Sequence, residues 1–181
     1  LNYIAYESGG VVQMGPPGSN VSQSKGGPYT PEEFKMLTPI CDHKNSDSAN
    51  LDNTLELLVL GGRNIAHAMM MLVPEAWQDN DQMPAYKKSF YEYHDCIIEP
   101  WDGPASICFT DGKIVGATLD RNGLRPSRYC VTNDDRLIMA SEAGALPVDQ
   151  SKIIKKGRLQ PGRMFIANLD HGRIISDRYD L

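Results

Sequence analysis

The chain of 181 residues can form one domain with a sizeable core and is too short for two domains of ordinary size. Hydrophobic residues make up 41 % and charged residues 23 %, as in globular proteins, and the net charge of -5 disfavours nucleic acid and anionic membranes as partners. No apolar run reaches the roughly 18 residues of a membrane span and no signal peptide opens the chain, so we expect a cytoplasmic protein without membrane contact.

The N-terminal segment differs in composition from the rest. Residues 1–29 are rich in Gly, Pro and Ser and follow neither the period of a strand nor that of a helix. Their glycines match neither the G-x-G-x-x-G pattern nor a P-loop, so a phosphate site is not expected. We predict an irregular or disordered segment over 1–29 and an ordered domain portion over 30–181.

The first helix is predicted directly after this segment. Thr30 is a suitable N-cap, Pro31 suits the first helical position, and Glu33 completes a capping box. The helix is expected to be short and to end before Pro39.

Two further helices follow. The first of them can be capped by Ser48 or Asn50 and ends at Gly61-Gly62. The next is capped by Asn64 and ends before Pro74. Both are apolar on more than one side, which predicts packing against a sheet with other helices around them.

Another helix is predicted over residues 84–98. Its apolar stripe consists of Tyr86, Phe90, Tyr93 and Ile97, and its charged residues lie elsewhere on the helix. His94 lies beside this stripe and is predicted to be a surface residue rather than a ligand.

After Pro100 the pattern changes to strands. Three hairpins are predicted, with turns at Asp111-Gly112, at residues 133–135 and at residues 170–172. Helices therefore come first and antiparallel hairpins follow, without the alternation of a parallel sheet. The sequence predicts an α+β fold with helices packed on one or both faces of antiparallel sheet.

The four cysteines do not indicate a metal or redox centre. No two of them have CxxC spacing, and the four histidines are scattered along the chain. Cys108 and Cys130 lie within predicted strands, where a small buried thiol is expected. We expect no metal ion and no cofactor in this segment.

The charged turn DRNGLRPSRY lies between two predicted strands. Asn122-Gly123 favours positive φ, and Pro126 holds Arg125 extended. Asp120 can pair with a flanking arginine, which favours a salt-bridged structural turn over an anion-binding site. The residues to which we assign this structural role are Asp120, Arg121, Gly123, Arg125 and Pro126.

The segment ATLDRNGLRPSRY resembles one found in glutamate synthase large subunits, and its shorter Asp-x-x-Gly-x-Arg-Pro core recurs in other type 2 glutamine amidotransferases. The segments TPICDHKNSDSANLDNTLELLVLGGRN, FYEYHDCIIEPWDGPASICFTDGK, MASEAGALP and GRLQPGRMF are similar to the same subunit. From about Glu32 to Asp177 the resemblance is continuous. It implies the C-terminal portion of a glutaminase domain, and hence a partial αββα sandwich of the N-terminal-nucleophile hydrolase type.

The resemblance also implies a reaction. In this family an N-terminal cysteine attacks the side-chain amide of glutamine, with its own α-amino group as base, and an Asn side chain and a Gly amide stabilise the oxyanion. The released ammonia serves glutamate synthesis from 2-oxoglutarate in a separate flavin domain. FMN and an iron–sulfur cluster are therefore implied for the full-length enzyme, and glutamine and the remaining domains of the large subunit as partners.

One substrate-binding element transfers to this chain. Glutamate synthases carry a Ser-Asp-Ser-Ala segment whose aspartate holds the α-amino group of glutamine, and here it is Ser46-Asp47-Ser48-Ala49. The resemblance thus implies that Asp47, Ser46 and Ser48 bind substrate. By pattern alone Asp47 would help to cap the helix, and the two roles can coexist.

Other family features differ. The chain begins with Leu1, its four cysteines are internal, and Tyr6-Glu7-Ser8 stands where a weak match would place His-Asn-Gly. Two interpretations remain open: part of a glutamate synthase, or a non-catalytic remnant domain that acts as a glutamine-binding or protein-interaction module. Under both we expect no glutaminase activity, and weak or no glutamine binding, for the isolated chain.

Overall fold

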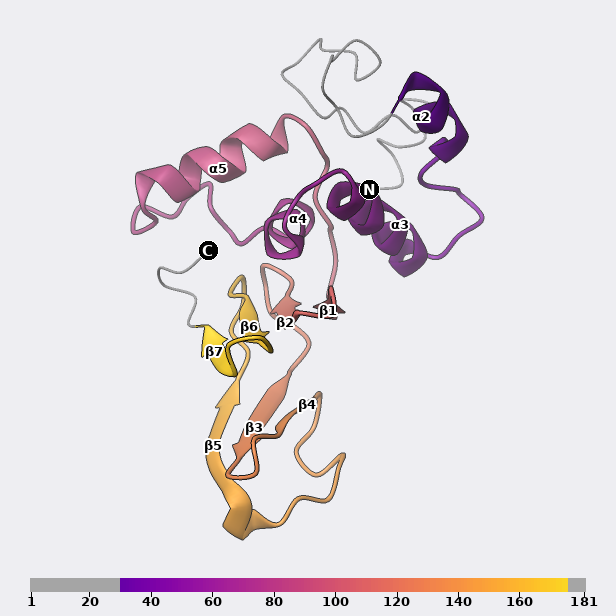
Figure 1. Cartoon of the computed structure of the whole chain (residues 1–181). Coiled ribbons are helices and arrows are strands. Elements are labelled where there is room, and N and C mark those ends of the chain that lie inside the picture. The colour runs from indigo at the N-terminus through magenta and orange to yellow at the C-terminus, as the bar shows by residue number, and fades with distance from the viewer. Residues whose placement is uncertain (1–29, 176–181) are drawn as a thin grey trace. The chain divides into compact units, whose positions relative to one another are not determined.

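The computed structural model describes residues 30–175, which divide into two compact units at Trp101 and Asp102 (Figure 1). The first unit is helical and the second consists of antiparallel strands, which confirms the predicted α+β class. The predictions for residues 1–29 lie outside the described residues. The expected packing of helices on sheet stays a prediction.

The first two helices begin at side-chain caps. Helix α2 spans Pro31–Leu37, and Thr30 and Glu33 form the predicted capping box: Thr30 Oγ1 accepts from Glu33 N at 3.2 Å, and Glu33 Oε2 accepts from Thr30 N at 2.7 Å. Helix α3 spans Asp47–Leu60, and its cap is Ser46, whose Oγ accepts from Ala49 N at 3.2 Å. The predicted caps Ser48 and Asn50 were wrong, because the helix begins before them and the Asn50 amide is fully buried.

Helix α4 spans Ile65–Leu72 and packs against α3 (Figure 1). Its cap is Asn64, as predicted: Oδ1 accepts from Ala66 N at 2.8 Å. Leu58 of α3 and Met69 and Leu72 of α4 are fully buried, and they form the centre of the first unit. Within the described ranges, no helix is long and apolar enough to cross a membrane.

Helix α5 spans Ala85–Asp95, and only part of the predicted apolar stripe is buried: Ile97, just after the helix, is buried and Phe90 is half-buried. Tyr86 is 69 % exposed and Tyr93 50 %, whereas Tyr91 and His94 are buried. Residues 91 and 94 are one turn apart and therefore share one face of the helix. Tyr91 can be buried because its hydroxyl donates to Glu75 Oε1 at 2.9 Å, an interaction that hydrophobic spacing does not reveal.

A four-stranded antiparallel sheet joins two of the predicted hairpins in the order β1-β2-β6-β7. The first hairpin pairs β1 (Ser106–Thr110) with β2 (Ile114–Leu119), and the second pairs β6 (Phe165–Asn168) with β7 (Arg173–Ile175). Both hairpins confirm the predicted turns, and the pairing of β2 with β6 connects them.

A three-stranded antiparallel sheet has the order β4-β3-β5. It contains the predicted hairpin of β3 (Arg128–Thr132) and β4 (Leu137–Ala140), and a strand that was not predicted, β5 (Ile153–Arg158), preceded by the short helix η2 (Gln150–Lys152). The sequence IIKKGR does not alternate apolar and polar residues, so its strand character arises from pairing with β3 rather than from its own pattern.

Cys108 differs from its predicted environment. It is exposed on β1, whereas its neighbour Phe109 is buried, because successive side chains of a strand point to opposite faces. Cys41 is buried, Cys130 is partly buried and Cys96 is exposed, and all four thiols are free.

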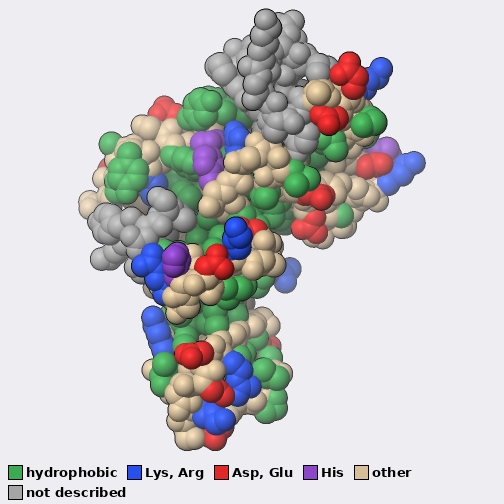
Figure 2. All heavy atoms as spheres, in the orientation of Figure 1, with side chains coloured by type: hydrophobic (Ala, Val, Ile, Leu, Met, Phe, Trp, Pro, Cys, Tyr) green, Lys and Arg blue, Asp and Glu red, His purple; other side chains and the backbone are tan. Residues whose placement is uncertain are grey.

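On the face of the second unit seen in Figure 2, acidic and basic side chains are interspersed.

Each sheet places an aromatic ring over a glycine of the neighbouring strand. Phe109 pairs with Gly116 and Tyr129 with Gly157. A Cβ atom at Gly116 would lie 2.1 Å from Phe109 Cζ, and one at Gly157 would lie 2.3 Å from Tyr129 Cζ. The rings occupy the space that a side chain would need, so glycine is required at both positions.

We therefore expect Gly116→Ala to lower the free energy of unfolding by about 1–3 kcal/mol, because the added methyl group overlaps the buried Phe109 ring. Urea denaturation of the chain measures this loss. In a Phe109→Leu background the same substitution should cost clearly less. Equal costs in the two backgrounds would contradict the proposed overlap.

Candidate functional site

The family-like segment Ser46-Asp47-Ser48 forms the N-terminus of α3. Ser46 is the N-cap, Asp47 is the first helical residue, and all three side chains are exposed. The Oγ atoms of Ser46 and Ser48 lie 3.2 Å apart, and Ser46 Oγ also accepts from Ala49 N. The structure thus presents the three predicted substrate-binding residues together at one helix end.

The side chain of Asn50 holds the loop that leads into this helix, a role that the sequence analysis did not predict. Asn50 is 0 % exposed and bonds both peptide groups of Asp42: its Oδ1 accepts from Asp42 N at 3.0 Å, and its Nδ2 donates to Asp42 O at 3.1 Å. Asn45 Nδ2 lies 3.4 Å from the same Oδ1. The signal available in the sequence was an asparagine within a helical segment, where this residue is unfavourable unless its side chain has a specific partner.

The next turn of α3 holds the start of the loop. Asn53 Nδ2 donates to Ile40 O at 3.0 Å, and Cys41 Sγ lies 3.5 Å from Thr54 Oγ1. Thr54 Oγ1 in turn donates to Asn50 O at 2.8 Å. Two turns of the helix therefore fix the chain just before Asp47, and an exposed carboxylate on such a frame can pair with an ammonium group.

The turn after β2 differs from its prediction at Asp120. This residue is 3 % exposed, and its carboxylate accepts from three backbone groups: Ala105 N at 3.0 Å, Asn122 N at 3.0 Å and Gly123 N at 3.1 Å. The predicted ion pair of Asp120 with a flanking arginine was wrong. The buried carboxylate is stabilised here by backbone N–H groups, two of them from the turn itself and one from Ala105.

The two flanking arginines bind elsewhere. Arg121 Nη2 lies 3.0 Å from Asp102 Oδ1, and Arg125 Nε donates to Pro104 O at 3.4 Å. Gly123 has φ 60°, and a Cβ atom there would lie 2.4 Å from Pro161 Cγ. Pro126 follows Arg125 and leads into β3. The described contacts of these residues hold the turn.

We expect Asp120→Asn to lower the free energy of unfolding by about 2 kcal/mol, because an amide cannot accept from all three N–H groups and turns a donor toward one of them. Arg121→Gln, at an exposed ion pair, should cost less than about 1 kcal/mol. Guanidinium denaturation of both variants measures the difference. Similar losses for the two would contradict the assignment of Asp120 as the main support.

Two histidines meet between α4 and α5. His67 Nε2 lies 3.2 Å from His94 Nε2, and His94 Nδ1 lies 2.7 Å from Phe90 O. Because a carbonyl oxygen only accepts, His94 Nδ1 carries its proton and His94 Nε2 accepts from His67. The prediction of His94 as a surface residue was wrong, since its ring is buried between neighbouring aromatic rings.

Burial lowers the pKa of both histidines below the ordinary value of 6.5. The neighbouring ring and Arg63 further lower the pKa of His67; for His94, the Phe90 carbonyl opposes the shift and Arg63 adds to it. The unfolded chain therefore binds protons more readily than the folded chain once the pH falls below about 6.5.

We expect the free energy of unfolding to fall as the pH drops from about 7.5 to about 5.5, and this fall to be smaller in His94→Gln. Urea denaturation at each pH measures it. His171→Gln, at an exposed turn, is the matched control and should keep the wild-type slope. An unchanged slope in His94→Gln would show that the pair does not couple to folding.

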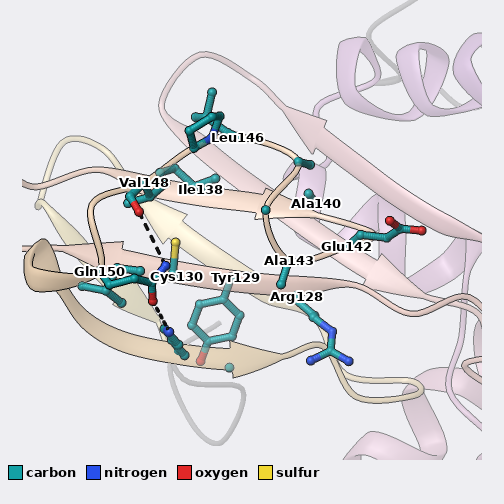
Figure 3. A pocket seen from close by; sticks show the side chains of 16 residues that line it. Arg128, Tyr129, Cys130, Ile138, Ala140, Glu142, Ala143, Leu146, Val148 and Gln150 are labelled. Atoms are coloured by element: carbon teal, nitrogen blue, oxygen red, sulfur yellow. Dashed lines mark hydrogen bonds between the residues drawn. The ribbon is translucent and has the colours of Figure 1, made fainter.

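A concave region lies on the three-stranded sheet and has a volume of about 310 Å³ (Figure 3). Cys130 and Ile138 of the sheet and Leu146 of the following loop line it, and Arg128 and Glu142 lie toward one end. This lining mixes apolar groups with charges of both signs. None of the substrate-binding residues predicted from the sequence belongs to it.

A metal ion would need several His, Cys, Asp or Glu side chains close together. Between residues 30 and 175, no three His, Cys, Asp or Glu side chains are grouped so that they could hold one. An iron–sulfur cluster needs a set of cysteine ligands, and the cysteines of this chain do not form one. No chemical step is therefore assigned to such a group here.

Comparison with known proteins identifies similar sequences. Residues 20–179 match the family of class-II glutamine amidotransferases. The glutamate synthase [NADPH] large chain of Bacillus subtilis is 52 % identical over 146 residues, which cover 81 % of this chain and 10 % of that protein.

Two further relatives are a ferredoxin-dependent glutamate synthase 2 of Synechocystis sp. and a glutamate synthase [NADH] of Schizosaccharomyces pombe. Both are 48 % identical, over 151 and 148 residues, and the matches cover 82 % and 81 % of this chain. They cover 10 % and 7 % of the relatives, so the chain spans about a tenth or less of their length.

Proposed function

The chain belongs to the class-II glutamine amidotransferases, and from this premise we propose that it forms the C-terminal portion of the glutamine-hydrolysing domain of a glutamate synthase. In this proposal residues 30–181 supply substrate-binding and scaffold elements of the domain. The observation that carries the proposal is the exposed Asp47 carboxylate next to a loop that the buried Asn50 amide and the buried Cys41 hold to α3.

The role proposed for Asp47 follows from charge and geometry. The α-ammonium group of glutamine carries a positive charge, and a carboxylate can bind it through a charge-assisted hydrogen bond. Ser46 and Ser48 flank Asp47 in the sequence, and their hydroxyl groups, 3.2 Å apart, can bond to the same ligand. The cap at Ser46 fixes the direction in which the helix begins.

Hydrolysis requires groups that these 181 residues do not supply. Class-II chemistry, as implied by the resemblance, uses a cysteine that carries both the thiol and a free α-amino group. The four cysteines here are internal, and Cys41, which lies closest in sequence to Asp47, is buried against Thr54. We therefore propose that this polypeptide, taken alone, binds glutamine weakly and does not release ammonia from it.

The proposal extends to the fold and to the parent enzyme. The helices α3 to α5 and the antiparallel sheets would be parts of an αββα sandwich, which the family assignment and the order of elements support. FMN and the iron–sulfur cluster would be held by other domains of the large subunit, where ammonia and 2-oxoglutarate form glutamate. The extent of the relatives beyond this chain supports that division.

The test is a titration of the labelled chain with L-glutamine, followed by NMR. We expect shifts of the backbone amides of residues 46–49 at millimolar ligand, because the side chains of residues 46–48 are exposed to solvent, and no release of ammonia. In Asp47→Asn the affinity should fall about tenfold or more, because the ammonium group loses its counter-charge.

Glutaramate is the matched ligand control, because it has the amide and the carboxylate of glutamine but lacks the α-ammonium group. It should shift residues 46–49 far less than L-glutamine does. Equal shifts with both ligands, or shifts that persist in Asp47→Asn, would contradict the proposed role. Ammonia release by the purified chain would contradict the proposed inactivity.

A further inference from the structure

We propose that Asn50 is a positioning residue for Asp47: its buried amide closes residues 42–50 into one rigid element that presents the carboxylate to the ligand. This inference rests on the proposed binding of glutamine at Asp47. It adds a residue that does not touch the ligand and that the family segment Ser46-Asp47-Ser48-Ala49 does not include.

The amide of Asn50 pairs with Asp42 as one peptide group pairs with another. Oδ1 accepts from Asp42 N and Nδ2 donates to Asp42 O, at 3.0 and 3.1 Å. An amide offers an acceptor and a donor side by side, which is what the N–H and C=O of one residue require. Aspartate offers no donor, and leucine offers neither, so only an amide side chain of this length fits.

The backbone of Asn50 joins the same element. Asn50 N donates to Ser46 O at 3.1 Å, which closes the first helical turn, and Asn50 O accepts from Thr54 Oγ1 at 2.8 Å. One residue therefore contacts the loop before Asp47, the cap beside it and the following turn. Because Asn50 is 0 % exposed, water cannot replace these bonds without opening the site.

The segment between Asp42, which Asn50 binds, and the start of α3 is polar and exposed. Residues 43–48 are all exposed, so burial does not hold them in place. Loop residues without buried contacts lose order unless hydrogen bonds fix them. Asp42 holds the start of the segment, since its Oδ1 accepts from Lys44 N at 2.9 Å and its carbonyl from Asn45 N at 3.0 Å. Asp42 is in turn fixed by the Asn50 side chain, so the placement of Asp47 depends on Asn50 at one end and on the Ser46 cap at the other.

The test substitutes Asn50→Asp, which keeps the shape and replaces the donor toward Asp42 O with an acceptor. Asn53→Asp is the matched control: it adds the same charge to the same helix and also removes one amide bond to the loop, at Ile40 O. Asn50→Ala is the second variant, in case Asn50→Asp does not fold.

Three readouts are compared with the wild-type chain: L-glutamine affinity against glutaramate affinity, amide hydrogen exchange of residues 42–49, and the urea midpoint. We expect the Asn50 variants to weaken L-glutamine binding about tenfold, to reduce the preference over glutaramate and to speed exchange. Asn53→Asp should retain the preference for L-glutamine. A purely structural role would lower the urea midpoint and weaken both ligands equally.

The outcomes separate this inference from the proposed function. If the wild-type chain shows no response to L-glutamine, the proposed function at this site fails. Amide hydrogen exchange of residues 42–49 then remains as the test of whether Asn50 orders the loop. Faster exchange of residues 42–49 in the Asn50 variants but not in Asn53→Asp supports positioning. The inference would be overturned if the Asn50 variants kept the wild-type rate of amide exchange and the wild-type preference for L-glutamine over glutaramate. It would also be overturned if Asn53→Asp had effects as large as those of the Asn50 variants.

Discussion

The structure depends on one constraint: polar backbone groups in buried, irregular segments must find hydrogen-bond partners. Buried polar side chains meet this need in both units. Asn50 bonds the N–H and C=O of Asp42 in the first unit, and Asp120 accepts from Ala105, Asn122 and Gly123 in the second. Both side chains act on the chain next to a regular element, and both decide the course of the chain there.

This constraint connects the fold to the candidate site. Asp47 itself is exposed, and exposed charges on a mobile loop bind weakly because ordering them costs conformational entropy. The Asn50 amide orders the loop before α3 in the folded chain, so the entropy cost of ordering it falls on folding rather than on binding. The serine cap at residue 46 completes the same frame.

The family relation fits a division of labour within a longer enzyme. The chain matches about a tenth or less of the length of the glutamate synthases compared, and in the proposed function its described residues supply a binding element and scaffold. The Asp120 turn, which attracts attention in the sequence through its charges, holds the backbone together and contains none of the proposed substrate-binding residues.

Local signals in the sequence determined the features that depend on neighbouring residues: the capping box at Thr30, the cap at Asn64 and the three hairpin turns. The family segment around Asp47 was likewise visible in the sequence. Only the tertiary structure decided the bond between Asp120 and Ala105, the buried face of α5, the strand β5 and the contacts of Asn50. The reason is physical, since caps and tight turns are set by bonds within a few residues, whereas these features depend on partners that lie farther along the chain.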